Sequence, residues 1–248
     1  MRILGIIPSR LESSRIKQKP LHKVFGVSLI EHVYRRALLC DILDDVIVAT
    51  DNESILSLIN SIGGKAMLTR KDHRNGTERM SEVVSEFSDF DYYVLINGDE
   101  ILLNPESIKE SIDTLVSNPW ADASILAIKY FKKNSKSDFK VVFKKNMELM
   151  YISREDIPSN SRNKVDNLLK AYHLMTFKKD TIIDYSKLGI SYLESIEDHE
   201  HLRLIENDYK IVGKIVDDDC ISMDTYEDIE AIEKKLKVDK IYLENIKD

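Results

Sequence analysis

The first hundred residues alternate short apolar segments with amphipathic ones, and this alternation restricts the possible fold more than any other feature. Strand patterns occupy residues 2–7, 46–49, 65–69 and 92–96. Helix patterns lie between them, at residues 29–39 after Ser28, from Asp51 or Asn52 to Gly63-Gly64, and at 77–87. Such βαβ alternation predicts an α/β fold with a mostly parallel, doubly wound sheet and right-handed crossovers.

The second half of the chain is less regular. It predicts a helix at residues 105–117, strands at 123–130, 140–143, 148–152 and 171–177, and helices at 196–205 and 226–236. Residues 154–168 are polar and loop-like, and the charged tail at 238–248 could be a short helix or a packing arm. We therefore expect one continuous domain over residues 1–248, with a small antiparallel lobe inserted at about 132–194.

Composition narrows the possible partners. Hydrophobic residues make up 43% of the chain, which is ample for a core, and the formal net charge of −7 argues against broad nucleic-acid or membrane binding. A local basic pocket remains possible. Cys40 and Cys220 form no disulfide framework or zinc motif, no segment resembles a signal peptide, and no apolar run has membrane-spanning length. We expect a cytoplasmic protein in a reducing compartment.

Two acidic motifs stand far apart in the sequence. Asp99 follows the apolar strand at residues 92–96, and Asp224 lies in Met-Asp-Thr near the C-terminus. An aspartate just beyond a strand end lies where open α/β sheets bind ligands, and two carboxylates together could hold a divalent metal on a substrate phosphate. Alternatively, each aspartate only caps a turn or helix, which is the better explanation for Asp224 alone. For the pair we favour metal binding.

A basic loop follows the first strand. Residues 8–20 carry Arg10, Arg15, Lys17 and Lys19, with three serines among them. Arginine and lysine neutralise phosphate oxygens, and serine hydroxyls supply further donors. The loop lacks the glycine patterns of dinucleotide-binding and P-loop proteins, so a dehydrogenase or a P-loop ATPase is disfavoured. A merely solvated charged loop is the alternative interpretation.

Taken together, these segments resemble the CMP-Kdo synthetase (3-deoxy-manno-octulosonate cytidylyltransferase) family. The family pattern I-P-A-R-x-x-S-x-R-x-P-G-K-P-L stands here as I-P-S-R-L-E-S-S-R-I-K-Q-K-P-L at residues 7–21. Its V-Q-G-D-E-P is similar to I-N-G-D-E-I at 96–101, and its V-D-T-P-E-D to M-D-T-Y-E-D at 223–228. T-R-K-D-H-R-N-G-T-E-R at 69–79 matches a further family segment, so the resemblance spans nearly the whole chain in order.

The resemblance implies a nucleotide-diphosphosugar-transferase type of fold, CTP and an acidic acceptor as substrates, Mg²⁺ as cofactor, and a homodimer. The implied metal ligands are Asp99 and Asp224, and the implied catalytic residues are these two with Arg10 and Lys19. Nucleotide contacts are implied for Pro8, Arg10, Ser13, Arg15, Lys19, His73, Gly76, Thr77 and Arg79. From the residues alone, His73 could equally be a loop cap. Acceptor contacts are implied for Asn97, Lys140, His173, Glu200 and His201.

The chain departs from the family mainly on the acceptor side. Asn97 replaces the family's Gln, and His201 replaces the Gln of E-Q-L-R. In the strand resembling H-L-G-[VI]-Y, Ala171 and Met175 replace the His and the Tyr, and His173 could compensate. The nucleotide side is retained apart from Lys17 and Gln18, which stand for a Pro and a Gly. Missing hydrogen-bonding groups would leave hydroxyls of a Kdo molecule unpaired.

We therefore expect a cytidylyltransferase that transfers CMP from CTP to a Kdo-like sugar acid and releases diphosphate, in bacterial surface-polysaccharide precursor synthesis. One alternative is the same reaction on a different acceptor, such as a modified ulosonic acid or a small phosphate- or phosphonate-bearing acid. Another is a catalytically silent nucleotide-binding homologue. No protein nucleophile is expected, because phosphoryl transfer asks mainly for positioning and charge neutralisation.

Overall fold

The computed structural model describes residues 1–12, 15–159, 161–163, 165, 167–218 and 221–247, with the backbone alone at His173. The chain forms two compact units. Unit 1 comprises Met1–Lys109 and Asp219–Asp248, and unit 2 comprises Glu110–Asp218. Helix α4 (Pro105–Val116) begins in unit 1 and ends in unit 2. The expectation of one domain with a lobe at 132–194 stays a prediction.

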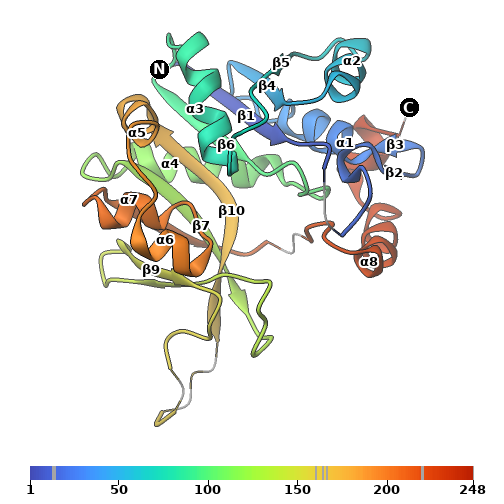
Figure 1. Cartoon of the computed structure of the whole chain (residues 1–248). Coiled ribbons are helices and arrows are strands. Elements are labelled where there is room, and N and C mark those ends of the chain that lie inside the picture. The colour runs from blue at the N-terminus through green and yellow to red at the C-terminus, as the bar shows by residue number, and fades with distance from the viewer. Residues whose placement is uncertain (13–14, 160, 164, 166, 219–220, 248) are drawn as a thin grey trace. The chain divides into compact units, whose positions relative to one another are not determined.

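Unit 1 contains the parallel sheet that the sequence predicts. Its strands are β1 (Ile3–Ser9), β4 (Asp45–Thr50), β5 (Ala66–Leu68) and β6 (Tyr92–Ile96). Their order across the sheet is β6-β1-β4-β5, and every neighbouring pair is parallel (Figure 1). The chain therefore moves outward from β1 to β5 and then returns to the other side of β1. This reversal of strand order creates a topological switch point between β1 and β6.

Three helices connect these strands: α1 (Leu29–Ala37), α2 (Glu53–Ser61) and α3 (Gly76–Glu86). Ser28, Asn52 and Asn75 begin them, each accepting a hydrogen bond from a backbone N–H of the first turn. The structure thus confirms Ser28 as a cap and selects Asn52 over Asp51. Gly63, with φ +77°, follows α2 as the predicted C-terminal signal. The helices pack their apolar faces on the sheet.

Strand β1 is longer than the sequence indicated, because it continues through Pro8 to Ser9. Proline has no backbone N–H and normally ends a central strand. Here β1 pairs with β6 only as far as Ile6, whereas its pairing with β4 continues to Ser9. The last residues of β1 therefore have a neighbour on one side only, and Pro8 is tolerated there.

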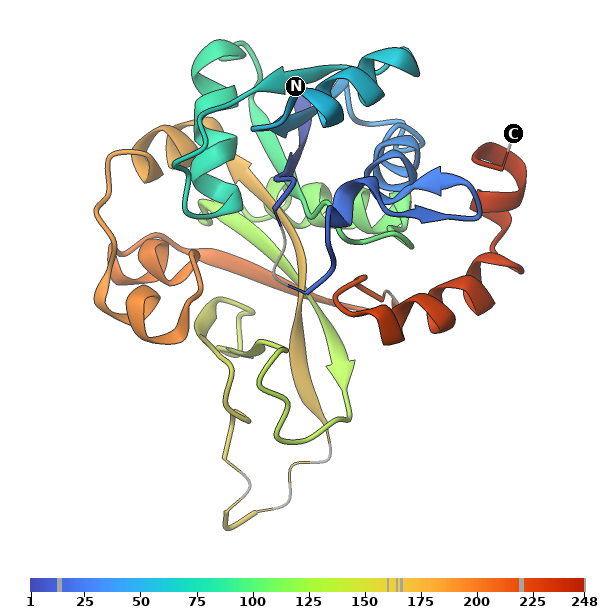
Figure 2. The ribbon, with the colours of Figure 1, turned by 45° about the vertical axis from the view of Figure 1, so that its right-hand side comes forward.

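The remaining elements of unit 1 lie around α1. They are the 3₁₀ helix η1 (Lys19–Leu21), the hairpin strands β2 (Lys23–Val24) and β3 (Val27–Ser28), α8 (Tyr226–Leu236) and α9 (Lys240–Asn245). The hairpin lies beside α9 (Figure 2), where Phe25 contacts Tyr242. Arg36 of α1 is only 1% exposed and donates to Asp239 at the start of α9. The predicted tail is therefore both a short helix and a packing arm.

Unit 2 has a mainly antiparallel sheet. Its strands are β7 (Ala123–Tyr130), β8 (Lys140–Phe143), β9 (Leu149–Ser153), β10 (Leu168–Lys178) and β11 (Ile211–Val216). The pairs β7–β10, β10–β8 and β8–β9 are antiparallel, and β7–β11 is parallel. Strands β7 and β10 lie side by side over most of their length (Figure 2). The register of this pair shifts between Tyr172 and Met175, which interrupts strict side-chain alternation there.

Several elements of unit 2 differ from the sequence prediction. Strand β11 and helix α5 (Lys179–Tyr185) were not predicted. The single helix predicted at residues 196–205 is wrong: two helices stand there, α6 (Tyr192–Glu197) and α7 (Leu202–Glu206). Asp198 adopts a left-handed conformation with φ 53° and separates them, which aspartate tolerates better than most residues.

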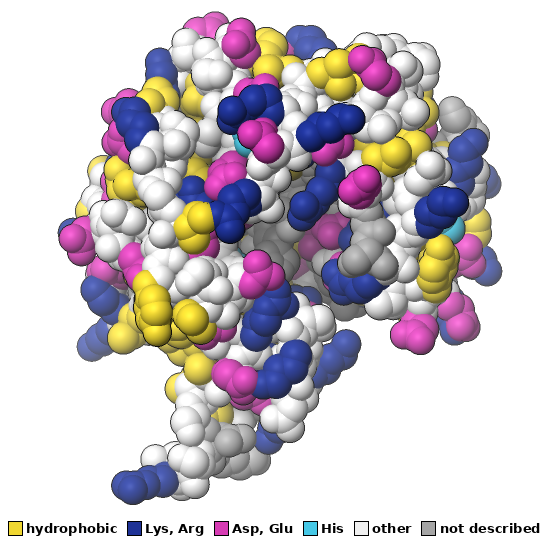
Figure 3. Space-filling model, in the orientation of Figure 1, with side chains coloured by type: hydrophobic (Ala, Val, Ile, Leu, Met, Phe, Trp, Pro, Cys, Tyr) yellow, Lys and Arg dark blue, Asp and Glu magenta, His cyan; other side chains and the backbone are white. Residues whose placement is uncertain are grey.

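The chain carries charged residues of both signs, 36 Lys and Arg and 43 Asp and Glu. On the face shown in Figure 3, Lys and Arg side chains and Asp and Glu side chains are interspersed among uncharged surface. Among the described residues, no helix is both long and apolar enough to cross a membrane.

Candidate active site

The C-terminal ends of β1 and β6 form the floor of the candidate site. Asn97, Gly98 and Asp99 follow β6 directly, as Arg10 and the basic loop follow β1. A Cβ at Gly98 would lie 2.9 Å from the backbone oxygen of Pro8. Glycine is therefore required for this close approach of the two strand ends. In open α/β sheets, ligands bind beyond the strand ends at such a switch point.

A pocket of about 1140 Å³ opens at this point, entirely within unit 1. It is lined by residues of β1 and the basic loop (Pro8, Ser9, Arg10, Leu11, Glu12, Arg15, Lys17, Gln18, Lys19 and Pro20), by Leu29, by His73, Asn75, Gly76 and Arg79, and by Asn97, Gly98, Asp99, Asp224 and Tyr226. Ligand pockets commonly measure about 300–1,000 Å³, so a nucleotide fits with room to spare. Five of these residues are Lys or Arg and three are Asp or Glu, which makes the pocket locally basic.

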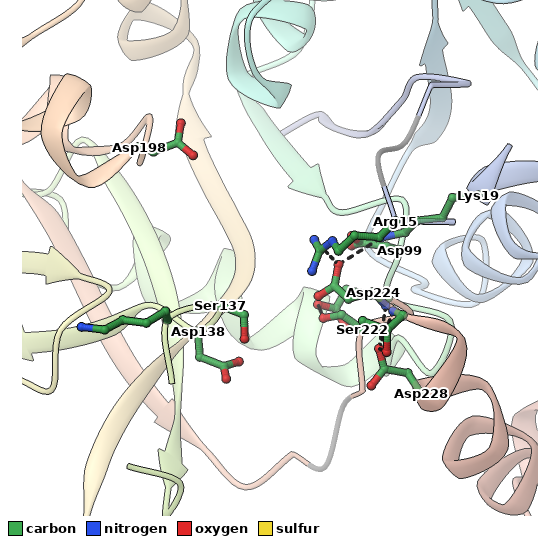
Figure 4. A network of polar contacts seen from close by, with 12 residues as sticks. Arg15, Lys19, Asp99, Ser137, Asp138, Asp198, Ser222, Asp224 and Asp228 are labelled. Atoms are coloured by element: carbon green, nitrogen blue, oxygen red, sulfur yellow. Dashed lines mark hydrogen bonds and ion pairs between the residues drawn. The ribbon is translucent and has the colours of Figure 1, made fainter. Parts of the chain in front are cut away.

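The two aspartates meet at one side chain. Lys19 Nζ lies 2.8 Å from Asp99 Oδ2 and 3.2 Å from Asp224 Oδ1, and Arg15 donates to the same Asp224 oxygen at 2.9 Å (Figure 4). A backbone hydrogen bond from Met223 N to Asp99 O, 3.0 Å long, holds the two acidic segments together. Carboxylates 125 positions apart in sequence thus face one cation.

The helix-capping interpretation of Asp224 is not what the structure shows. Helix α8 begins after Thr225, and the carboxylate that caps it belongs to Asp228. Asp228 Oδ2 accepts from Asp224 N at 3.0 Å and from Thr225 N at 2.7 Å. The Asp224 carboxylate is therefore directed to Lys19 and Arg15 (Figure 4).

The local backbone fixes the position of Lys19. It begins η1, with Gln18 in a left-handed conformation (φ 50°) before it and Pro20 after it. The Lys19 side chain is 13% exposed. Burial works to lower the pKa of its ammonium group, but Asp99 and then Asp224 together outweigh burial and raise the pKa above its usual value. Lys19 is therefore a fixed positive charge at neutral pH.

The segment at residues 69–79 supplies one wall of the pocket. His73 and Arg79 line it, although both also bind within the protein: His73 Nε2 contacts Glu82, and Arg79 pairs with Asp51 at 3.0 Å. Gly76, at the start of α3, lines the pocket as well. Thr77 is fully buried and is not among the lining residues. Burial lowers the pKa of the Arg79 guanidinium, with Asp51 opposing that shift.

Asp99 and Asp224 fit a magnesium ion whose remaining ligands come from substrate phosphates and water. In the part of the chain that is described, no group of three or more His, Cys, Asp or Glu side chains could hold a metal ion. Mg²⁺ is typically bound by one or two carboxylates, with substrate phosphates and water completing its shell. Two carboxylates that already contact one cation, beside a basic phosphate-sized pocket, fit that pattern.

The implied acceptor residues divide between the units. Asn97 lines the pocket of unit 1, whereas Lys140, Glu200 and His201 belong to unit 2. Lys140 is 0% exposed, and its ammonium donates to the backbone oxygens of Ser135 (2.7 Å), Asp138 (2.8 Å) and Arg154. These bonds use all three of its N–H groups, so its own surroundings argue against an acceptor contact.

His201 is buried beside Phe177, and its Nε2 lies 3.5 Å from Glu200 Oε1. Ala171 and Met175, which stand for the family's His and Tyr, are fully buried in β10. The His173 side chain and the whole of Ser13 lie outside the described residues, so both stay predictions.

Sequence reasoning missed several lining residues, among them Ser9, Asn75, Gly98 and Tyr226. Two of them carried a readable signal. Gly98 stands directly after a strand, where a close backbone approach is common, and Tyr226 follows the acidic motif by two residues.

Comparison with known proteins identifies the family of the chain. The chain matches the cytidylyltransferase family over residues 4–211. It is 37% identical to the 3-deoxy-manno-octulosonate cytidylyltransferase of Fusobacterium nucleatum, covering 97% of this chain and 99% of that one. It is 33% identical to the 8-amino-3,8-dideoxy-manno-octulosonate cytidylyltransferase of Shewanella halifaxensis, covering 96% of this chain and all of the other.

A solved structure of CMP:2-keto-3-deoxy-manno-octonic acid synthetase complexed with CTP superposes with a TM-score of 0.91 at 29% identity, covering 96% of this chain and 99% of that one. The fold and the site thus define a nucleotidyltransferase with an α/β nucleotide-binding sheet. More specifically, the chain belongs to the cytidylyltransferase family, and the resemblance to its CMP-Kdo synthetase branch is confirmed.

Proposed function

We propose that this protein transfers CMP from CTP to a 3-deoxy-ulosonic acid of the Kdo type and releases diphosphate, in the synthesis of bacterial surface-polysaccharide precursors. The observation that carries this proposal is the contact of Lys19 with both Asp99 and Asp224 at the floor of a basic pocket. The named relatives and the CTP complex of the structural neighbour support the choice of nucleotide and acceptor class.

In the proposed reaction, a hydroxyl oxygen of the acceptor attacks the α-phosphorus and loses its proton to solvent. The bond from that phosphorus to the diphosphate oxygen breaks. Both reactants are anionic, so the repulsion between them must be neutralised before they can approach in line. Arg10, Arg15 and Lys19 would bind the phosphates from the loop that follows β1.

Mg²⁺ would be held by Asp99 and Asp224, and it would supply charge neutralisation and a more acidic acceptor hydroxyl. The protein's own contribution is positional. The hydrogen bond from Met223 N to Asp99 O keeps the two carboxylates together, and the short η1 helix fixes the backbone of Lys19 beside them. Pro8, His73, Gly76 and Arg79 would line the remaining surface of the nucleotide.

The principal test is a diphosphate-release assay with CTP, Mg²⁺ and Kdo. Asp99→Asn and Asp224→Asn should each reduce kcat by a factor of about 10² or more, because each removes charge from the reacting centre. Far-UV circular dichroism would check that both variants fold. Near-normal turnover in either variant would remove that residue from the site.

A different acceptor is the second candidate, and two observations favour it. Ala171 and Met175 offer no hydrogen bond where the family has His and Tyr, and a relative of similar identity is named for the 8-amino sugar. Kdo, 8-amino-Kdo and a phosphonate acid should therefore be compared by kcat/KM. A preference for 8-amino-Kdo would support the second candidate, and a preference for Kdo the first.

A silent homologue would bind CTP without turnover. Retention of Arg10, Lys19, Asp99 and Asp224 in one pocket argues against it. Such a homologue would release no diphosphate with any acceptor of the panel, whatever its affinity for CTP.

We further propose that the protein is a cytoplasmic homodimer. The family resemblance supports the dimer, and the two cysteines without a disulfide framework support a reducing compartment. Light scattering during gel filtration would report the mass, and a value near the monomer's 28.7 kDa would contradict the dimer.

A further inference from the structure

The charges around Asp99 and Asp224 balance within the protein itself. Among the described residues, the two carboxylates pair with two cations, Lys19 and Arg15, so the formal charges of these four side chains sum to zero. A divalent metal entering this cluster would leave an excess of two positive charges. Lys19 is 13% exposed, which limits the screening of that repulsion by water and salt.

The Lys19 ammonium group and a divalent metal would compete for the same position. Its Nζ contacts one oxygen of each carboxylate at 2.8 and 3.2 Å, so it occupies the place at which an ion shared by the two aspartates would sit. The backbone of η1 is fixed by Leu21 N to Gln18 O and by His22 N to Lys19 O. The ammonium can therefore leave mainly by rotation of its flexible four-carbon side chain.

A triphosphate would resolve the conflict, because it carries several negative charges. Arg10 lines the same pocket and makes no ion pair with any described residue, so it can receive a phosphate without breaking an existing pair. Lys19 and Arg15 could then exchange their carboxylate partners for phosphate oxygens. The two aspartates would thereby become available to a metal at the moment when the nucleotide arrives.

We infer that Lys19 is an internal counter-ion, which holds the Asp99–Asp224 position closed to divalent metal until the phosphates of CTP draw it away. Metal binding is thus coupled to nucleotide binding, and Lys19 is the positioning residue that couples them. This inference rests on the proposed function for the identity of the nucleotide. It adds that the protein binds metal poorly when no nucleotide is present.

The test is a Mn²⁺ titration of the nucleotide-free protein, with unbound Mn²⁺ measured by electron paramagnetic resonance. Lys19→Gln and Lys19→Met should bind Mn²⁺ about tenfold or more tightly than the wild type, because a competing charge is gone. Lys19→Arg keeps the charge and should stay close to the wild type. Lys17→Met is the matched control, since it removes a lysine that lines the same pocket but contacts neither aspartate.

A second measurement follows from linkage. If Lys19 couples the two ligands, Mn²⁺ should strengthen CTP binding more in the wild type than in Lys19→Gln, as measured by calorimetry. Adding Asp224→Asn to Lys19→Gln should abolish the tight Mn²⁺ site. Persistence of that site in the double variant, or equal Mn²⁺ affinity in wild type and Lys19→Gln, would overturn the inference.

No acceptor takes part in these titrations. Failure of CMP transfer would therefore count against the proposed function and leave the coupling measurable. Unchanged Mn²⁺ affinity beside normal CMP transfer would remove the coupling and leave the function standing.

Discussion

Asp224 and Asp228 lie four residues apart and meet different partners. Asp224 contacts Lys19 and Arg15, whereas Asp228 accepts backbone N–H groups at the start of α8. Their substitutions should therefore separate activity from stability. Asp228→Asn should lower the free energy of unfolding by about 0.5–2 kcal/mol while much of the activity remains. Asp224→Asn should abolish turnover with little loss of stability. Urea denaturation measures the stability of each variant, and a diphosphate-release assay measures its activity. Loss of activity in Asp228→Asn and loss of stability in Asp224→Asn would contradict the site.

Gln18 has a left-handed backbone conformation at a position where the family pattern has glycine. Its φ of 50° is unfavourable for a residue with a Cβ. Gln18→Gly should raise the free energy of unfolding by about 0.5 kcal/mol, because relief of strain exceeds the added entropy of the unfolded chain. Urea denaturation would measure the change. Gln18→Ala, which keeps the Cβ, should give no such gain, and destabilisation by glycine would contradict the assignment.

At the scale of elements, local sequence patterns predicted most helices and strands of unit 1 but only some of those of unit 2. Strands and helices of the βαβ region have strong periodicity and good caps, such as Ser28 and Asn52. Strand β11 was not predicted from the sequence, because Gly213 interrupts its apolar pattern. A Cβ at Gly213 would overlap the ring of Phe143, so the glycine serves a contact made by a distant strand. Sequence periodicity carries no information about such a contact.

The same limit applies to the site. Asp99 and Asp224 could be predicted because each follows a recognisable motif, and the basic loop because it follows a strand. The burial of Lys140 could not be predicted, because it depends on oxygens of three separate residues that folding brings together. The role of Asp228 in capping α8 was missed, although Thr225-x-x-Asp228 has the spacing of a capping box.

Lys140 links the segment before β8 to the end of β9. Lys140→Met would leave three backbone oxygens without their donor, and we expect a loss of about 3 kcal/mol in the free energy of unfolding. Lys136→Met is the control, because the Lys136 side chain is exposed and its one ion pair among the described residues is with Glu155, which is also exposed. Urea denaturation of both variants would measure the difference. Equal stability of the two would show that the Lys140 bonds contribute nothing net.

Asp138 gives the same region a dependence on pH. Burial alone would raise the pKa of this carboxyl, but hydrogen bonds from Lys170 (2.6 Å), Ser135 (2.6 Å) and Tyr130 outweigh it and hold the pKa far below its usual range. Burial and then Asp138 raise the pKa of Tyr130 to about 12. A carboxyl with a depressed pKa stabilises the fold above its unfolded pKa of about 3.9, and this contribution is lost as the pH falls further.

Asp138→Asn should therefore lower the Tm at pH 7. The gap from the wild type should narrow as the pH is taken from about 4 downward, because the wild-type carboxyl then becomes protonated. Thermal unfolding across a pH series would measure both curves. A gap that stays constant down to the acid limit would mean that the Asp138 charge is not involved.

At the scale of the whole molecule, ligand binding should be visible as stability. CTP with Mg²⁺ at about 100 times its Kd should add about 2.7 kcal/mol, which corresponds to a rise in Tm of roughly 5 °C or more for a chain of this size. Removing Mg²⁺ with a chelator should reduce that rise. Differential scanning fluorimetry would measure it, with ATP as the nucleotide control. An equal response to ATP and CTP would contradict a cytidine-specific pocket.

Arg36 gives the last segment of the chain an electrostatic role in addition to its packing. This guanidinium is buried on the first helix, donates to the backbone oxygen of Leu103, and has its negative partner in Asp239, some two hundred residues later. Nearly the entire chain must therefore be synthesised before the charge of Arg36 can be paired with Asp239. A variant that omits the final ten residues would lose Asp239 and leave Arg36 without its carboxylate partner. Protein engineering should therefore leave this end of the chain intact.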